Sequence, residues 1–417
     1  MNGGTPGAPL VGDNRRLNMT RTSRLRTTTL STLSTAAGLL MAAGSAHALD
    51  YTGYFRAGPG GTTDGGASRA CYALNGGTSG MKYRLGNECD IYGEFQLAQG
   101  FKKDGIDYKV VLMTDYFNPH SDADDAKHLR LAQMYAEAKG FDFAPEATVW
   151  AGKERGRRGD VHIVDTYFTE MAGIGAGFKG LNVGPGKLGV AYYTNDKDNN
   201  QRPAHRGNVE YVDINSNTDG TLAFFGTATK SQFAGGTNGW GLTAKHVQAK
   251  LFGSDFNNVL WVQYAQGSTG LNSNFGNQTD TSAAKKFRVV ESVNFQQGAW
   301  GGMGMLLWAN EKDNAGKATV STSVGGRLSY GVTRNFKLLG EAGVSQYKPD
   351  GGQRARLTKV TFAPTLSTGP ALMDRPEFRL YVTHAKWNKA AGNVTGVAGY
   401  DGETSGTSFG AQVEVWF

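Results

Sequence analysis

The chain has 417 residues, of which 60 are Gly and 11 are Pro, and 39% of its residues are apolar. Glycine at about twice its usual share disfavours a helix-rich protein and suits strands joined by many turns. The formal net charge is +7, but five Arg and one Asp lie within residues 1–48, so the remaining residues carry only +3. A nucleic-acid-binding function therefore loses its main support.

The first 48 residues have the pattern of a targeting segment. The stretch MTRTSRLRTTTLSTLSTAAGLLMAAGSAHA, residues 19–48, has an Arg-rich start, an apolar centre and a small-residue end. This pattern is typical of a cleaved secretory signal peptide. The alternative, an anchoring helix, needs about 20 apolar residues. We expect cleavage after Ala48, with Met1 or Met19 as the start, and one domain over residues 49–417.

The two cysteines, Cys71 and Cys89, lie 18 positions apart. In the oxidising compartment that export implies, a disulfide between them is expected. The alternative is a metal site, which would need more ligands nearby than the sequence offers. In the chain-entropy model, closing such a loop contributes about 3 kcal/mol.

From residue 51 onward, segments of about ten residues alternate between polar and apolar side chains, separated by turns rich in Gly, Asn, Asp and Ser. This period of two predicts strands, and no sustained helical period competes with it. The expected strands lie at 51–58, 90–99, 107–113, 130–139, 147–152, 175–180, 186–194, 208–215, 220–229, 240–250, 257–266, 286–295, 301–310, 319–330, 334–346, 355–363, 377–386 and 407–417.

These segments number 18, and single-chain outer-membrane barrels have an even number of strands. A chain with so many strands must protect its sheet edges, and a closed barrel does so. The fold class expected is therefore all-β, an antiparallel transmembrane barrel. The rival is a soluble periplasmic protein with several sheets. The terminus GAQVEVWF argues against it, because outward apolar residues continue to the last position.

The terminus also predicts two surfaces, because neighbouring residues of a strand point to opposite faces. Phe417, Val415 and Val413 would form a lipid-facing column, and Trp416 would face the lumen with the polar residues before it.

Four segments of the chain resemble the maltoporin family of outer-membrane sugar porins. They are KYRLGNEC (82–89), WAGK with GDVHIVDTY (150–153 and 159–167), WVQYA (261–265) and FGAQVEVWF (409–417). The resemblance spans essentially the whole region after residue 48. It implies an 18-stranded barrel, a homotrimer, an inward-folded third loop, and facilitated diffusion of malto-oligosaccharides along a row of lumen aromatics.

The resemblance also assigns residues. Tyr54, Tyr92 and Trp416 would form the aromatic row, and Tyr167 would stand opposite it at the constriction. The flanking polar and ionic groups would be Arg56, Arg84, Glu94, Arg130, Arg158, Asp160 and Asp165. The alternation of side chains along a strand agrees with these assignments independently, because it puts Tyr54 on the same face as Arg56, and Tyr92 on the same face as Glu94.

Both ends of this row depart from the family pattern. Residues 115–128 contain no Trp where the family's second loop supplies one, so Tyr116 or Phe117 is left to replace it. At the other end, Met373 stands where a Trp is expected, and Leu260 where a Phe is expected. A shorter or different sugar, or weaker capture, would follow from these changes.

Each assignment has a structural alternative. Tyr54 and Tyr92 would also suit a membrane-interface girdle, and Arg84 and Arg130 would suit lumen ion pairs without a transport role. For three other features we expect a structural role. His162 is expected to be structural rather than a metal ligand, and Trp387 to lie at a membrane or loop boundary. Asp122, Asp124 and Asp125 are expected to form a solvated surface loop rather than a Ca²⁺ loop.

Two other functions compete with a maltoporin. A porin with broader or different selectivity, for sucrose, β-glucosides or small anions, would explain the altered row ends. A barrel-embedded hydrolase is disfavoured because no nucleophile–base arrangement is evident. No enzyme activity, cofactor, metal ion or nucleic-acid partner is expected. The expected partners are sugars, outer-membrane lipid and further copies of the chain.

Overall fold

The computed structural model describes residues 48–63, 69–74, 76, 81–119, 129–196, 202–251, 254–397 and 399–417. The expected signal segment, except Ala48, lies outside these residues, as do Asp122, Asp124 and Asp125 of the second loop. Within the described part, no helix is long and apolar enough to cross a membrane.

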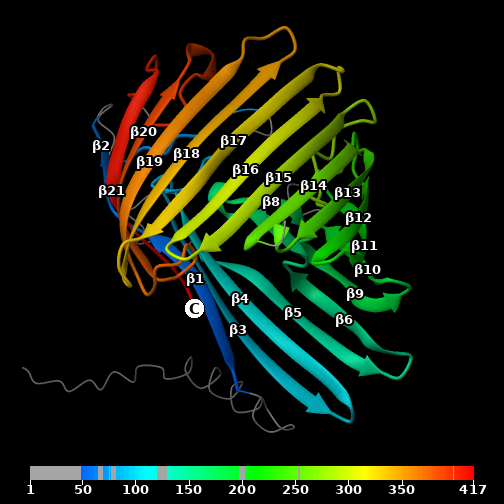
Figure 1. The fold of residues 1–417 in the computed structure, drawn as a ribbon. Coiled ribbons are helices and arrows are strands. Elements are labelled where there is room, and N and C mark those ends of the chain that lie inside the picture. The colour runs from blue at the N-terminus through cyan, green and yellow to red at the C-terminus, as the bar shows by residue number, and fades with distance from the viewer. Residues whose placement is uncertain are drawn as a thin grey trace, which may run out of the picture. The chain divides into compact units, whose positions relative to one another are not determined.

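Eighteen long strands of the described chain form a closed antiparallel barrel (Figure 1). Closure is visible in β1, which pairs with β3 on one side and with β21 on the other. The barrel strands are β1 (Asp50–Ala57), β3 (Ile91–Lys103), β4 (Ile106–Asn118), β5 (Leu129–Phe141), β6 (Ala144–Glu154), β9 (Gly173–Val183), β10 (Gly186–Asn195), β11 (Ala204–Asn217), β12 (Gly220–Ser231), β13 (Asn238–Gln248), β14 (Phe256–Gly267), β15 (Lys285–Gln297), β16 (Trp300–Lys312), β17 (Ala318–Gly331), β18 (Phe336–Pro349), β19 (Ala355–Ser367), β20 (Glu377–Trp387) and β21 (Ser405–Trp416). The predicted fold class and strand number are confirmed, and most strands are longer than their alternating segments indicated.

Three short strands and two short 3₁₀ helices complete the described elements. Strand β2 (Gly60–Thr62) follows β1 along the edge of β21. Strands β7 (Arg158–Val161) and β8 (Thr166–Glu170) form a hairpin within the third loop, around η2 (His162–Val164). Helix η4 (Lys389–Ala391) follows β20.

The two ends of the barrel differ in the length of their connections. At one end the connections are short, such as the two residues Asp104 and Gly105 between β3 and β4, which both have positive φ (49° and 84°). Two-residue hairpin turns favour this geometry. The other end carries the long connections 58–90, 155–172, 268–284 and 388–404. This asymmetry is the one found in outer-membrane barrels, where the short turns face the periplasm.

The barrel wall separates an outward apolar face from an inward polar face. In β20, Phe378, Leu380 and Val382 point outward and are 45–63% exposed, whereas Arg379 and Tyr381 between them are buried. Alternation of this kind places apolar side chains toward lipid and polar ones toward the lumen.

Aromatic pairs mark two levels on the outward face. Near the short-turn end, Trp300 and Tyr330 have ring centroids 4.7 Å apart. Near the long-loop end, the rings of Trp240 and Tyr264 lie 5.1 Å apart. Trp and Tyr suit the two interfaces of a membrane, because one part of each ring is apolar and another is polar.

Two loops fold into the barrel and fill part of its lumen. Ile163 and Phe168 of the third loop pack against inward residues of β14–β16, including Trp261, which is 1% exposed. Tyr83 of the first loop lies against Gly343 of β18, where an added Cβ would come within 2.2 Å of its ring. The expected inward third loop is thus present, and the first loop joins it.

The expected disulfide is formed between Cys71 and Cys89, whose Cα atoms are 5.9 Å apart. It joins the two arms of the first loop on either side of Tyr83 and Arg84.

Candidate functional site

A row of four aromatic rings runs along the lumen from the loop end toward the turn end. Phe117 on β4 lies 6.5 Å from Tyr92 on β3, and Tyr92 lies 6.0 Å from Tyr54 on β1. Tyr54 is the register partner of Trp416 on β21. Each of four adjacent strands thus contributes one ring, and the three aromatics assigned from the sequence are brought together.

Each ring of the row has an arginine beside it. The guanidinium carbon of Arg56 lies 5.1 Å from the centroid of Tyr92, and that of Arg84 lies 6.0 Å from Tyr54. The corresponding distance from Arg130 to Phe117 is 5.8 Å, and that from Arg375 to Trp416 is 4.2 Å. A guanidinium near a ring face is attracted by the π electrons and keeps N–H groups for other partners.

Carboxylates neutralise the arginines in the middle of the row. Arg56 forms ion pairs with Glu88 at 2.9 Å, Asp90 at 2.8 Å and Asp165 at 3.1 Å. Arg84 pairs with Glu88 at 2.8 Å and with Glu414 at 2.9 Å. Burying these charges is tolerable because each is paired and hydrogen-bonded.

The hydroxyl of Tyr54 belongs to the same network. It donates to Glu414 Oε1 at 3.0 Å and accepts from Arg84 Nη2 at 2.5 Å. Its ring is therefore held in one orientation.

The third loop reaches across the lumen to this network. The backbone N–H of Arg84 donates to the carbonyl of Ile163 at 2.8 Å, and the rings of His162 and Trp416 meet edge to face at 6.0 Å. Burial alone would raise the pKa of Asp165, but the charges of Arg84, Lys82 and Arg56 hold it well below its ordinary value. Asp165 is consequently ionised and joins the loop to β1.

The hairpin in the third loop presents the remaining predicted groups. Asp160 and Tyr167 are register partners across β7 and β8, and Arg158 covers the ring of Tyr167 at 3.9 Å. Burial raises the pKa of Tyr167 to about 12, so its hydroxyl is neutral. Burial also raises the pKa of Asp160, whereas burial and the charge of Arg84 lower that of His162.

A second network joins the loop-end half of the row to the third loop. Arg155 binds Glu94, and it binds Asp115 at 2.9 Å. Arg130 also pairs with Asp115, at 2.7 Å, while its side chain stays 57% exposed. All the predicted ionic residues thus lie inside the barrel, although Arg155 and Asp115 were missed.

Comparison with known proteins identifies the family. The family model for the LamB porin matches residues 49–417. The chain belongs to the LamB porin family. It forms an outer-membrane porin channel, and its family and fold indicate a channel rather than an enzyme.

Two solved porin structures share the fold of this LamB porin at low identity, and a third matches it less closely. OccK3 of Pseudomonas aeruginosa matches with a TM-score of 0.51 and 8% identity, covering 88% of this chain and 95% of that one. A BenF-like porin of Pseudomonas fluorescens Pf-5 matches with a TM-score of 0.50 and 8% identity, covering 88% and 99%. An anion-selective porin of Comamonas acidovorans has a TM-score of 0.46 and 12% identity, covering 89% and 100%.

The structure resolves which residue continues the row at the loop end. Phe117 faces the lumen beside Tyr92 and is 37% exposed. Tyr116, its neighbour on the strand, points to the opposite face.

One expectation about the turn end of the row was wrong. Leu260 does not take the place of a lumen phenylalanine, because it pairs with His246 and Glu291 on the outward face of the wall. Trp261, next to it, points inward and is covered by the third loop. Met373 lies in the turn 368–376 and is 44% exposed, and Trp387 packs with Tyr72 and Tyr400 outside the row.

Arg375 was not found from the sequence. It comes from the turn between β19 and β20, forms ion pairs at 2.9 Å with Glu377 and with Glu414, and covers the ring of Trp416. A turn has no alternating pattern that reveals which side chains enter the lumen, so no sequence signal was available.

Proposed function

We propose that this LamB porin carries malto-oligosaccharides, or closely related gluco-oligosaccharides, by facilitated diffusion along the aromatic row. The observation that supports this most is the arrangement of Phe117, Tyr92, Tyr54 and Trp416 on four adjacent strands. The site assignments of the row and of its ionic neighbours belong to this proposal.

The chemistry of a sugar fits such a row. The C–H faces of a pyranose pack on aromatic rings, while its hydroxyls need donors and acceptors to replace lost water. Guanidiniums and carboxylates beside each ring offer both. Several weak platforms in series allow a sugar to enter and to leave, which transport requires.

Charge balance favours a neutral solute. Arg56 and Arg84 are paired with Glu88 and Glu414, and Arg130 is paired with Asp115. A row of compensated charges presents dipoles rather than a net field, so it offers hydrogen bonds without retaining an ion.

A second candidate is a porin of broader selectivity on the same scaffold. The position of Arg375 favours it, because a guanidinium 4.2 Å from the Trp416 centroid occupies ring surface that a sugar would otherwise contact. The absence of Trp from residues 115–128 also favours it.

Single-channel conductance in a planar bilayer, measured while maltohexaose is titrated, tests the proposal. We expect current block at millimolar sugar. Absence of block would overturn the malto-oligosaccharide assignment. A liposome-swelling series then tests the second candidate, which requires rates ordered by solute size alone.

Export and assembly are further proposals from the sequence. Cleavage after Ala48 predicts a mature chain that starts at Leu49, which N-terminal mass spectrometry would reveal. A homotrimer predicts a band of three times the chain mass in unheated gel electrophoresis, and a monomer band alone would contradict it.

A further inference from the structure

Basic side chains form a row on the outward face of the wall, at the long-loop end of β15–β20. Each of them is exposed and alternates with inward residues along its strand. The row consists of Lys285 on β15, Lys312 on β16, Lys348 on β18, Arg356 on β19 and Lys386 on β20. We call this row the basic belt.

The basic belt has no acidic counterpart in the described part of the chain. None of its members forms an ion pair with a described residue. The outward positions of the described wall strands carry no carboxylate at this end of the barrel either. A second copy of the chain would therefore bring no acidic wall surface to this level.

Two members of the belt repel each other. Lys285 and Lys312 are register partners across β15 and β16, and like charges directly opposite each other in a sheet are destabilising. The acidic neighbours of Lys312 do not offset this repulsion. Glu311 points to the inward face, and Asp313 accepts two backbone N–H bonds in the following turn, both at 2.9 Å. The pair therefore points to an anion that the described chain does not supply.

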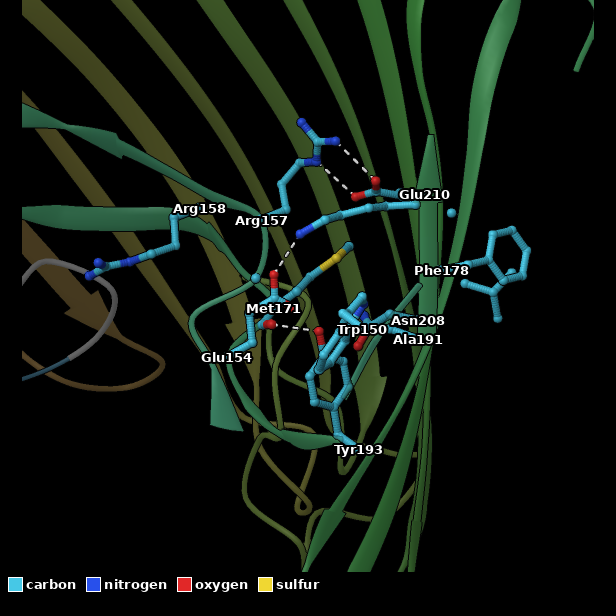
Figure 2. Close-up of a pocket in the computed structure, with 14 residues that line it drawn as sticks. Trp150, Glu154, Arg157, Arg158, Met171, Phe178, Ala191, Tyr193, Asn208 and Glu210 are labelled. Carbon is cyan, nitrogen blue, oxygen red and sulfur yellow. Dashed lines mark hydrogen bonds and ion pairs between the residues drawn. The ribbon is translucent and has the colours of Figure 1, made fainter. Parts of the chain in front are cut away.

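Basic residues that point into the barrel show the contrast. Lys286, the neighbour of Lys285 on β15, binds Asp280 at 2.9 Å. Figure 2 shows a second case, in a cavity beside the third loop, where Arg157 binds Glu210 through two bonds of 2.7 and 2.9 Å. The outward belt has no such partner among the described residues, so its charge is available to a ligand outside the barrel.

Aromatic rings place the belt at the level of lipid headgroups. Phe287 and Trp308 lie on the same outward face as the lysine pair, toward the middle of the barrel, with ring centroids 5.9 Å apart. Phe287 is two residues from Lys285, which is about 7 Å along a strand. Because Trp and Tyr gather where the apolar core of a membrane meets the headgroups, the belt lies among the headgroups of the leaflet away from the periplasm.

We infer that the basic belt binds a glycolipid whose headgroup is a disaccharide with a phosphate at each end. Lys285 and Lys312 hold one phosphate, and Lys348 and Arg356 hold the other. Only β17, with Ala318 at this level, separates the two sets, so they lie about two strand spacings, or roughly 10 Å, apart. A disaccharide spans such a distance, and arginine and lysine are the side chains that bind phosphate.

The acyl chains of this lipid lie along the outward apolar residues of the same strands. The inference does not depend on the solute that the lumen carries.

The test measures binding of bisphosphorylated lipid A to the purified porin in detergent by native mass spectrometry. The belt variant combines Lys285→Gln with Lys312→Gln. Each basic residue near an anionic lipid surface changes the affinity about fivefold, so we expect binding to weaken about 25-fold. Dephosphorylated lipid A keeps the acyl chains, and we expect it to bind the unmodified porin more weakly than lipid A does.

The matched control combines Lys103→Gln with Lys250→Gln. Both lysines are exposed at the short-turn end, so this variant loses the same charge at the other side of the membrane. It should bind lipid A like the unmodified porin. The shift between folded and unfolded bands in unheated gels checks that both variants fold.

Three results would overturn the inference. They are no lipid A binding to the unmodified porin, equal binding by the belt variant and its control, and equal binding of lipid A and its dephosphorylated form. Phosphatidylglycerol bound as tightly as lipid A would reject the disaccharide headgroup. The same spectra report the oligomeric mass, and a smaller mass in the belt variant alone would assign the belt to an interface between copies instead.

Discussion

Both sides of the lumen carry inward aromatic rings, and they differ in what covers them. Trp261 on β14 meets Phe168 of the third loop at 5.6 Å and is 1% exposed. Tyr54 and Tyr92, on β1 and β3, are only partly buried and have arginines beside them. An inward direction therefore does not make a ring a transport platform, because a loop decides whether solute reaches it.

The largest effect is expected for Trp261→Ala, which tests whether this inward ring packs against the third loop. Loss of a large buried side chain lowers the free energy of unfolding by about 3–5 kcal/mol. Urea titration, followed by the shift between folded and unfolded bands in unheated gels, measures the change. The control is Trp240→Ala on the outward face, where the ring is 46% exposed and its loss should matter less. Equal effects would mean that the third loop does not pack on β14.

The complementary change is Tyr92→Ala on the open side. We expect sugar affinity to fall about tenfold, or about 1.4 kcal/mol, with little change in unfolding. Maltohexaose block of single channels measures the affinity. Tyr330→Ala, an outward ring that is 40% exposed, serves as the control and should leave block unchanged. An unaltered affinity in Tyr92→Ala would remove this ring from the path.

The last two residues, Trp416 and Phe417, allow the lumen face and the lipid face of one strand to be compared directly. Phe417 is 48% exposed, packs on Tyr51 at 5.2 Å, and exchanges backbone hydrogen bonds with Gly53 where the barrel closes. We expect Phe417→Ala to reduce the amount of folded barrel in the outer membrane. Trp416→Ala should leave that amount unchanged and weaken sugar block. The same defect in both variants would contradict the assignment of the two faces.

The smallest expected effect concerns a charge on the outward face. Glu291 on β15 points outward midway between Phe287 and Phe295, with Leu260 and Leu306 as its cross-strand neighbours. A carboxylate facing lipid is destabilising, though less so than Arg or Lys. Glu291→Leu should raise the free energy of unfolding by about 1 kcal/mol in the same urea titration. Val289→Leu should change it little, and no gain in Glu291→Leu would place that carboxylate outside the lipid.

Local sequence patterns were sufficient to predict much of the fold of this protein. Alternation placed Tyr54 with Arg56, and Trp416 opposite Phe417, because successive side chains of a strand have no other choice. Cysteine spacing and export predicted the disulfide, and the family resemblance predicted the third loop. The assignment of Leu260 failed by one position, and in a strand a shift of one residue reverses the face.

The sequence by itself determined the barrel, its strand number and the direction of most wall side chains, because these follow from a period of two and from turn residues. Only the tertiary structure decided which inward groups meet. Arg375 reaches Trp416 from a turn, and Glu154, Arg157 and Tyr193 surround one cavity from separate segments. Closure of the barrel and the path of its inner loops bring these residues together, and neither is encoded in any short stretch of the chain.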